Sequence, residues 1–222
     1  MTGKPPGRFI TLDGPGGVGK STAVGAVARL LAAYGEQVHS TKEPSDLPLG
    51  QFIRANADDY DGAALACLVV ADRHHHLAQE ILPHLRAGVT VVCDRYIAST
   101  LVVQSLDGVP QRYLLDLNAG LRMPDLAVIL TADPLALAAR IAERGATHRF
   151  NRDVSFPARE VARYEDVAEL LRGMSVPVLV LDTGAASPAA IAEQIASATL
   201  GLGNVSTHLG SAPASTQGAT PA

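Results

Sequence analysis

The segment TLDGPGGVGKST, residues 11–22, limits the fold of this chain more than any other stretch. Gly14, Gly19, Lys20 and Ser21 occupy the four fixed places of the pattern G-x-x-x-x-G-K-[ST]. Glycines let backbone N–H groups turn inward around phosphate oxygens, and the helix that follows directs its N-terminus at the same charge. The motif therefore predicts a strand before the loop, a helix after it, and a loop that binds the phosphates of a nucleotide.

Apolar runs that suit buried strands alternate with segments of helical spacing along most of the chain. The expected strands lie in RFITLD, QVHSTKEP, VTVVCD, LAVILTAD and VPVLVLDT. The unbroken apolar run in VTVVCD is typical of a strand covered on both faces. The alternation predicts an α/β fold, a parallel sheet with helices on both faces. Ligands of such sheets bind beyond the carboxyl ends of the strands, where Asp13, Glu43 and Asp94 are expected.

Length and composition favour one globular domain. The chain has 222 residues, 47% of them hydrophobic, which is enough to form a core. We expect a flexible lead at 1–8, one folded domain at 9–200 and a disordered tail at 201–222. The tail has no charged side chain and too little apolar surface to offset the entropy lost on ordering.

The charge and the apolar runs restrict the partners and the compartment. The net charge of −4 provides no basic field for nucleic acid or an anionic membrane. No segment resembles a signal peptide or a membrane span, so a cytoplasmic location is expected. Cys67 and Cys93 lie in apolar runs and are expected to be buried thiols in a reducing compartment.

Charged residues at the strand ends suit phosphate chemistry. Lys20 can reach the β and γ phosphates, and Ser21 can offer its hydroxyl to Mg²⁺. Asp94 follows a buried strand, as do carboxylates that hold Mg²⁺, although a helix N-cap would also suit it. Arg73 and Arg95 could clamp a second phosphate group, since the guanidinium fork matches phosphate oxygens. A surface ion pair is the alternative for each arginine.

The segment after the helix ALAARIAERG is rich in arginine. Arg144, Arg149 and Arg152 suit a lid that closes over a transferring phosphate, and they equally suit a solvated charged face. The consecutive residues His74 to His76 would point in three directions on a helix and lack Cys, Asp or Glu partners. We therefore expect a partly exposed helix face there and no metal site.

Several separated motifs, taken together, resemble those of thymidylate kinases of the bacterial type over roughly residues 9–200. The motifs, in chain order, are FITLDGPGGVGKST, TKEPSDLPLGQFIR, ADRHHH, VVCDRYIASTLVVQ, PDLAVIL, ARIAERG and LVLDTGAASPAAIAEQI. The resemblance implies a P-loop NTPase-type five-stranded parallel sheet in the order 2-3-1-4-5 with an arginine-bearing lid. It also implies Mg²⁺-dependent transfer of the γ-phosphoryl group of ATP to a nucleoside monophosphate, with dTMP the expected acceptor, in a homodimer.

The same resemblance assigns roles to individual residues. It implies that the ATP phosphates contact Gly14, Pro15, Gly16, Gly17, Val18, Gly19, Lys20, Ser21 and Thr22. The implied acceptor-binding residues are Asp13, Glu43, Pro44, Arg54, Val69, Arg73, Arg95, Thr100, Val103 and Gln104. The implied catalytic residues are Lys20, Asp94, Arg95 and Arg149. The lid would span about 145–158 with Arg144, Arg149 and Arg152, and Ser21 and Asp94 would hold Mg²⁺, partly through water.

This chain departs from the family pattern at positions that contact the sugar and the base of the acceptor. Gly16 stands where the family usually has a carboxylate that contacts the sugar hydroxyl. Val69 and Val103 stand where it usually has aromatic residues. Ser45-Asp46 replaces Gly-Gly, and Asn151 replaces an acidic residue of the lid. The acceptor pocket is therefore expected to lack a carboxylate and two rings, which favours weaker binding of dTMP.

These departures keep two other hypotheses open. The chain could be a paralogous kinase for a different nucleotide or for another small molecule such as a nucleoside. A neutral hydroxyl acceptor would need a general base, for which Glu43 is the candidate. The chain could also be a nucleotide-binding module without turnover. The set of Arg54, Arg73 and Arg95 favours an anionic acceptor over a nucleoside.

Overall fold

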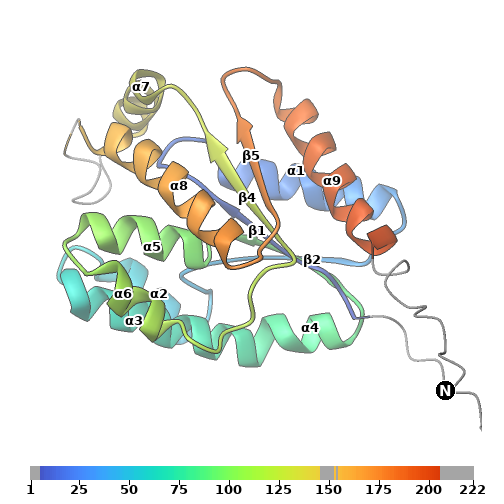
Figure 1. Ribbon diagram of the computed structural model, residues 1–222, viewed down its shortest axis with the longest axis horizontal. Helices are drawn as coiled ribbons and strands as arrows, with labels where there is room; N and C mark the ends of the chain where they lie inside the picture. The colour runs from blue at the N-terminus through green and yellow to red at the C-terminus, as the bar shows by residue number, and fades with distance from the viewer. Residues whose placement is uncertain (1–5, 146–152, 154, 206–222) are drawn as a thin grey trace, which may run out of the picture.

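The computed structural model describes residues 6–145, 153 and 155–205 of the chain. Its centre is one parallel sheet (Figure 1). The strands are β1 (Phe9–Asp13), β2 (Val38–Lys42), β3 (Thr90–Asp94), β4 (Leu126–Thr131) and β5 (Val178–Asp182). They lie in the order β2-β3-β1-β4-β5, and each neighbouring pair is parallel. The predicted α/β fold and the strand order 2-3-1-4-5 are therefore confirmed.

Helices cover both faces of the sheet. They are α1 (Lys20–Ala33), α2 (Pro48–Ala55), α3 (Gly62–His76), the π-helical η1 (Leu77–Ile81), α4 (Leu82–Arg86), α5 (Ile97–Leu106), α6 (Gln111–Leu117), α7 (Pro134–Arg144), α8 (Phe156–Gly173) and α9 (Pro188–Val205). Helices α1 and α9 pack together on one face. On the other face α5 packs against α3 and α8 (Figure 1).

Each central strand contributes to two hydrophobic cores, because successive side chains of a strand point to opposite faces. Val91 and Cys93 of β3 belong to the core that also contains Leu101 of α5. Val92, between them, belongs to the core formed with Val27 of α1 and Ile195 of α9. This double burial explains why the central strands are apolar without a break.

The expected carboxylates meet at one edge of the sheet. Strands β1 and β3 run side by side, with Leu12 opposite Asp94. The N–H of Glu43, directly after β2, donates to the Asp94 carbonyl at 2.9 Å. Asp13 ends β1 and precedes the glycine-rich loop. The strand ends therefore bring together the residues that sequence spacing had placed there.

The expected domain boundaries differ from the structure at both ends. Helix α9 continues to Val205, past the expected end of the domain at 200. The reason is that Leu200 and Leu202 still pack against the core, so the expected tail at 201–222 begins inside this helix. Residues 206–222 lie outside the described part of the chain. At the other end, the N–H of Gly7 donates to the Leu85 carbonyl at 2.8 Å, so the expected lead at 1–8 is attached before β1 begins.

The expectation that both cysteines are buried is wrong for Cys67. Cys93 of β3 is buried in the core, whereas Cys67 is exposed on α3, where its thiol lies 3.6 Å from the hydroxyl of Tyr113. Helix α3 is apolar on much of its surface, so the apolar run did not reveal which side faces the core. None of the helices within the described ranges combines the length and apolar character needed to cross a membrane.

Candidate active site

The phosphate loop joins β1 to α1 and depends on glycine at two places. At Gly14 φ is 150°, and a Cβ there would lie 2.3 Å from the Leu130 carbonyl oxygen of the neighbouring strand. Gly19 is the N-cap of α1 with φ of 98°, a left-handed conformation that side chains disfavour. The loop can therefore pass close to β4 and turn directly into the helix.

Lys20, the first residue of α1, is held back against the loop. Its Nζ donates to the carbonyls of Gly14 and Pro15, both at 2.8 Å, and the side chain is buried. Burial, together with the positive charge of Arg95, lowers the pKa of Lys20 to about 7, while Asp94 and Glu160 act in the opposite direction. Anionic phosphate in the loop would favour the charged amine.

Ser21 and Asp94 form a pair of oxygen ligands at the mouth of the loop. Ser21 Oγ donates to Asp94 Oδ2 at 2.5 Å, Ser21 is exposed, and Asp94 is half-buried. Mg²⁺ typically takes one or two protein oxygens and completes its octahedron with water and substrate phosphate. The exposed hydroxyl and the adjacent carboxylate fit this requirement.

Asp13 was expected to bind the acceptor, but the structure places it beneath the site. Its Oδ1 accepts from the N–H groups of Tyr96 and Ser99, both at 2.9 Å, and from Ser99 Oγ at 2.6 Å. Burial raises the pKa of Asp13, and the hydrogen bonds from Ser99 and Tyr96 oppose that shift. Asp13 is fully buried and therefore anchors the start of α5 under the cavity.

Arg95 connects β3 to α5 with an unusual backbone. Its φ is 72°, which costs a residue with a side chain about 1–2 kcal/mol. Its N–H donates to the Leu12 carbonyl at 2.9 Å, and its Nη1 donates to Ser99 Oγ at 3.4 Å. The guanidinium lines the cavity beside the phosphate loop. Such strain is characteristic of functional sites whose surroundings fix the conformation.

Arg73 and Glu43 form a buried ion pair in the wall of the cavity. Arg73 Nη2 and Nε lie 2.7 and 2.8 Å from Glu43 Oε2. The other donors of Arg73 reach Asn118 Oδ1 at 2.6 Å and Thr100 Oγ1 at 2.9 Å. The guanidinium carbon also lies 4.9 Å from the centre of the Tyr96 ring. Arg73 is therefore fixed from several sides.

Two members of this network were missed by sequence reasoning. Asn118 lies after α6, far from any motif, and only the packed structure brings it to Arg73. His76 was assigned to a partly exposed helix face, but its side chain is buried. Its Nδ1 lies 3.4 Å from Glu43 Oε1, and its Nε2 lies 2.8 Å from Thr41 Oγ1. Burial lowers the pKa of His76, but the hydrogen bond and charge of Glu43, with Glu80, raise it above its usual value overall.

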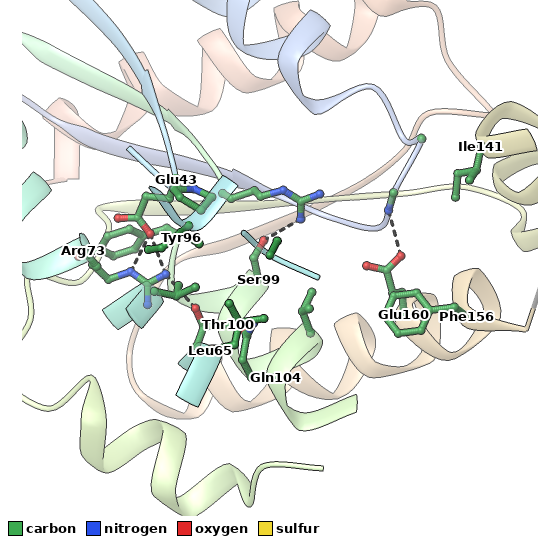
Figure 2. A pocket seen from close by; sticks show the side chains of 18 of the residues that line it. Glu43, Leu65, Arg73, Tyr96, Ser99, Thr100, Gln104, Ile141, Phe156 and Glu160 are labelled. Carbon is green, nitrogen blue, oxygen red and sulfur yellow. Dashed lines mark hydrogen bonds and ion pairs between the residues drawn. The ribbon is translucent and has the colours of Figure 1, made fainter. Parts of the chain in front are cut away.

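A cavity of about 370 Å³ extends between the phosphate loop and the Arg73–Glu43 pair (Figure 2). This volume is in the range typical of small-molecule sites. The predicted acceptor residues that line it are Glu43, Pro44, Val69, Arg73, Arg95, Thr100, Val103 and Gln104, together with Gly16 and Gly17 of the loop. The residues that the resemblance implies therefore surround one cavity, and their binding of an acceptor stays a prediction.

Arg54 does not line this cavity. Its guanidinium donates to the carbonyls of Pro44 and Ser45 and pairs with Asp46 Oδ1 at 2.8 Å. The exposed Asp46 also pairs with Lys42 at 3.1 Å. Arg54 therefore holds the turn after β2. The guanidinium donors that were expected to bind the acceptor phosphate bond to this turn instead.

The expected lid is only partly within the described residues. Helix α7 ends at Arg144, and Gly145, directly after it, lines the cavity. Arg149 and Arg152 lie outside the described residues, as does Asn151. Their expected roles stay predictions.

Helix α8 contributes two wall residues that sequence reasoning missed. Phe156 and Glu160 both line the cavity, and Figure 2 shows them side by side opposite Glu43 and Arg73. Glu160 Oε2 accepts from the Gly16 N–H at 3.0 Å. The spacing of four residues, which places both on one face of a helix, was the available signal. The segment had been considered only for its arginines and for Asn151.

Comparison with known proteins gives one consistent result. A family model for thymidylate kinase matches residues 12–178. A probable thymidylate kinase of Caldivirga maquilingensis is 36% identical over 152 residues, covering 67% of this chain and 74% of that protein. A thymidylate kinase of Magnetococcus marinus is 39% identical over 148 residues, which cover 63% of this chain and 70% of that protein. A probable thymidylate kinase of Pyrococcus horikoshii is 34% identical over 178 residues, which cover 77% of this chain and 87% of that protein.

Proposed function

The chain belongs to the thymidylate kinase family, a family of nucleoside monophosphate kinases with ATP as donor, and we propose that it converts dTMP and ATP to dTDP and ADP with Mg²⁺. The observation that carries this proposal is the continuous cavity from Gly16 and Gly17 of the phosphate loop to Gln104. A nucleoside monophosphate in this cavity would have its phosphate beside the loop and its base away from it.

The donor side of the reaction is the phosphate loop. The backbone N–H groups of residues 17–22 would hold the ATP phosphates, with Lys20 contacting the β and γ groups. Pro15 has no N–H, and the Gly16 N–H donates to Glu160. An oxygen of the acceptor phosphate attacks the γ phosphorus as the bond to the ADP oxygen breaks. The attacking oxygen is already anionic, so positioning and neutralisation of charge supply most of the catalysis.

The cationic side chains serve that neutralisation. Arg95 would bind the acceptor phosphate, since it lines the cavity and lies close enough to Lys20 to shift its pKa. Two cations on either side of the transferring group would offset the repulsion between donor and acceptor phosphates. Arg149 of the lid is proposed to act on the same group.

Ser21 and Asp94 would hold Mg²⁺, with Asp94 acting partly through water. The ion would supply positive charge that offsets the negative charge of the donor phosphates. The hydrogen bond between Ser21 and Asp94 keeps both oxygens oriented toward the mouth of the loop.

The far end of the cavity would receive the base. Gln104 is 5% exposed, and within the described residues its amide makes no hydrogen bond, so both its donor and its acceptor are available to a base. Arg73 also lines the cavity, with an orientation fixed by Glu43 and Thr100. These groups suit the polar edge of a pyrimidine.

Val69 and Val103 favour one rival acceptor. Both line the cavity, where the family resemblance leads one to expect aromatic rings. Without these rings the cavity lacks the stacking contacts expected for thymine, so a monophosphate with another base is the rival acceptor. We also propose a cytoplasmic homodimer, as the resemblance implies.

A coupled assay of ADP release tests the proposed acceptor. The purified chain is incubated with Mg-ATP and one of dTMP, dUMP, UMP, dCMP, CMP, GMP, AMP or thymidine. We expect the highest kcat/KM with dTMP. A higher kcat/KM with another monophosphate would replace dTMP by that nucleotide, and turnover of thymidine alone would support a nucleoside kinase.

A further inference from the structure

We infer that Glu160 supplies the carboxylate that the phosphate loop lacks, and that its free oxygen accepts a hydrogen bond from the 3′-hydroxyl of the acceptor's sugar. The inference rests on the proposed function and names a specificity residue for it. The loop has Gly16 where a side chain would face the acceptor, and Glu160 of α8 reaches the same place from 144 residues further along the chain.

The two oxygens of Glu160 have different surroundings. Oε2 accepts from the Gly16 N–H at 3.0 Å, which fixes the carboxylate against the loop. Within the described residues Oε1 has no hydrogen-bond partner, although the side chain is only 4% exposed and lines the cavity. Figure 2 shows the carboxylate between the loop and the cavity. One oxygen is thus used for positioning, and the other is available to a ligand.

Nearby charges favour the anionic form of this carboxylate. Burial raises the pKa of Glu160 overall, and the Gly16 N–H and the charges of Arg95 and Lys20 limit that rise. Both cations face the phosphate end of the cavity in the proposed complex. The carboxylate therefore lies close to the two cations that would hold the phosphates.

The location of Glu160 is fixed by a second contact of α8. One turn further along, the Tyr164 hydroxyl lies 3.1 Å from Ser99 Oγ, which in turn donates to Asp13 at 2.6 Å. Tyr164 is 1% exposed. This chain of hydrogen bonds ties α8 to the start of α5, where Arg95 and Ser99 form the floor of the cavity. Glu160 is therefore held at a set distance from the acceptor site.

No other carboxylate in the described wall of the cavity can take this role. Glu43 also lines it, but its Oε2 is bonded to Arg73 and its Oε1 faces His76. Asp46, in the altered Ser45-Asp46 turn, is exposed and paired with Lys42 and Arg54. The free oxygen of Glu160 is thus the available anionic acceptor.

The 3′-hydroxyl follows from the order of groups in a nucleotide. The phosphate lies beside Arg95 and the base near Gln104, so the sugar lies between them. The donors on a nucleoside monophosphate between phosphate and base are its sugar hydroxyls, and a deoxyribonucleotide has only the 3′-hydroxyl free. A hydrogen bond from a hydroxyl to a buried carboxylate is of the strong, charge-assisted kind.

The test compares dTMP with 3′-deoxythymidine monophosphate, which lacks the proposed donor. We expect Glu160→Gln to lower kcat/KM for dTMP about 10- to 100-fold and for the 3′-deoxy acceptor less than about threefold. Glutamine separates the two roles of the side chain, because its carbonyl can keep the hydrogen bond from the Gly16 N–H while the anionic acceptor is lost. Glu165→Ala, at an exposed position of the same helix, is the matched control and should leave both values unchanged.

A second pair of variants moves the carboxylate back into the loop. Gly16 is not among the glycines with positive φ, so an aspartate can adopt its backbone conformation. Gly16→Asp alone should lower activity, because two carboxylates would then crowd the same place. In Glu160→Ala the same change should restore at least about tenfold of the lost kcat/KM for dTMP. We therefore expect Gly16→Asp to lower kcat/KM in the unmodified chain and to raise it in the Glu160→Ala variant.

Equal losses with both acceptors would overturn the inference, because Glu160 would then only shape the phosphate loop. ATP affinity, measured for each variant, checks that the loop is intact and should stay within about threefold of the parent. If the unmodified chain prefers another monophosphate, the proposed acceptor fails visibly in that control. The losses of kcat/KM in Glu160→Gln are then compared between that nucleotide and its 3′-deoxy form. Failure of the proposed acceptor is therefore distinguishable from failure of the proposed role of Glu160.

Discussion

Glu43 and Arg73 bury opposite charges against each other, with Arg73 Nη2 lying 2.7 Å from Glu43 Oε2 and both side chains almost inaccessible to solvent. Glu43 comes from the end of β2 and Arg73 from α3, so the pair joins the sheet to the wall of the acceptor cavity. The guanidinium stays charged when buried, and the carboxylate supplies the counter-charge that offsets its loss of hydration.

Removal of Glu43 should therefore strongly destabilise the fold. Glu43→Ala leaves the Arg73 guanidinium buried without its counter-charge, which we expect to lower the free energy of unfolding by about 3–5 kcal/mol. The double variant Glu43→Ala/Arg73→Met should be more stable than Glu43→Ala alone, because the uncompensated charge is gone. Urea unfolding followed by circular dichroism measures both. A loss below about 1 kcal/mol in the single variant would show that the pair contributes little.

Binding of ATP should be coupled to uptake of a proton at Lys20. The pKa of this amine is lowered to about 7 in the free protein, so at pH 8 most of it is neutral. Phosphate in the loop favours the charged form, so ATP binding at pH 8 draws a proton from the buffer and ATP affinity falls as pH rises above 7. Titration calorimetry in buffers of different ionisation enthalpy measures the uptake.

Lys20→Met is the control for this linkage and should remove the proton uptake at pH 8. Below pH 6 the amine is already charged before ATP binds, so uptake at this site should vanish in the unmodified chain as well. Uptake of equal size in the Met variant would assign the proton to another group.

A ring restored at Val69 should improve binding of dTMP. Val69 is half-buried and lines the cavity, so a phenyl ring there can contact a base. Aromatic pairs contribute about 0.5–1.5 kcal/mol beyond area burial, so Val69→Phe should lower KM for dTMP about 2- to 10-fold. KM for ATP is the internal control and should not change. Unchanged or abolished turnover of dTMP would show that the stacking argument is wrong.

Asp94→Asn should weaken the response to Mg²⁺. Residues that support metal ligands typically contribute about 10- to 100-fold in metal affinity. We expect the free Mg²⁺ concentration for half-maximal rate to rise by about tenfold or more, because Ser21 and its carboxylate partner would no longer hold the ion together. Rates are measured over a Mg²⁺ series at constant ATP. A lower maximal rate with an unchanged Mg²⁺ midpoint would place Asp94 outside the metal site.

The features with strong local signals could be predicted from sequence. The phosphate loop follows from residues 11–22 alone, because its glycines, lysine and serine have fixed spacing. The central strands follow from unbroken apolar runs, since helices cover both of their faces. The strand order came from the resemblance, because apolar runs do not specify which strands are neighbours.

The features that were missed depend on contacts between distant segments. Glu160 meets Gly16 only because α8 packs beside α5 and is tied to Ser99 through Tyr164. Asn118 reaches Arg73 only through the packing of the segment after α6. No motif surrounds these residues, so the sequence predicted a pocket without a carboxylate while α8 provides one.

Arg54 and Asp13 lie near the cavity, but local partners hold the Arg54 guanidinium and Asp13 Oδ1. Arg54 is occupied by the turn at 44–46, and Asp13 by the first turn of α5. Spacing locates a residue near a site, whereas its hydrogen bonds decide whether the side chain reaches it.

The most direct test of the proposed reaction is identification of its products. The chain is incubated with dTMP and Mg-ATP, and the nucleotides are separated by anion-exchange chromatography over time. We predict that dTDP and ADP form in equal amounts and that Lys20→Met forms neither above background. ADP formed without dTDP, or no product while ATP still binds, would contradict phosphoryl transfer to dTMP.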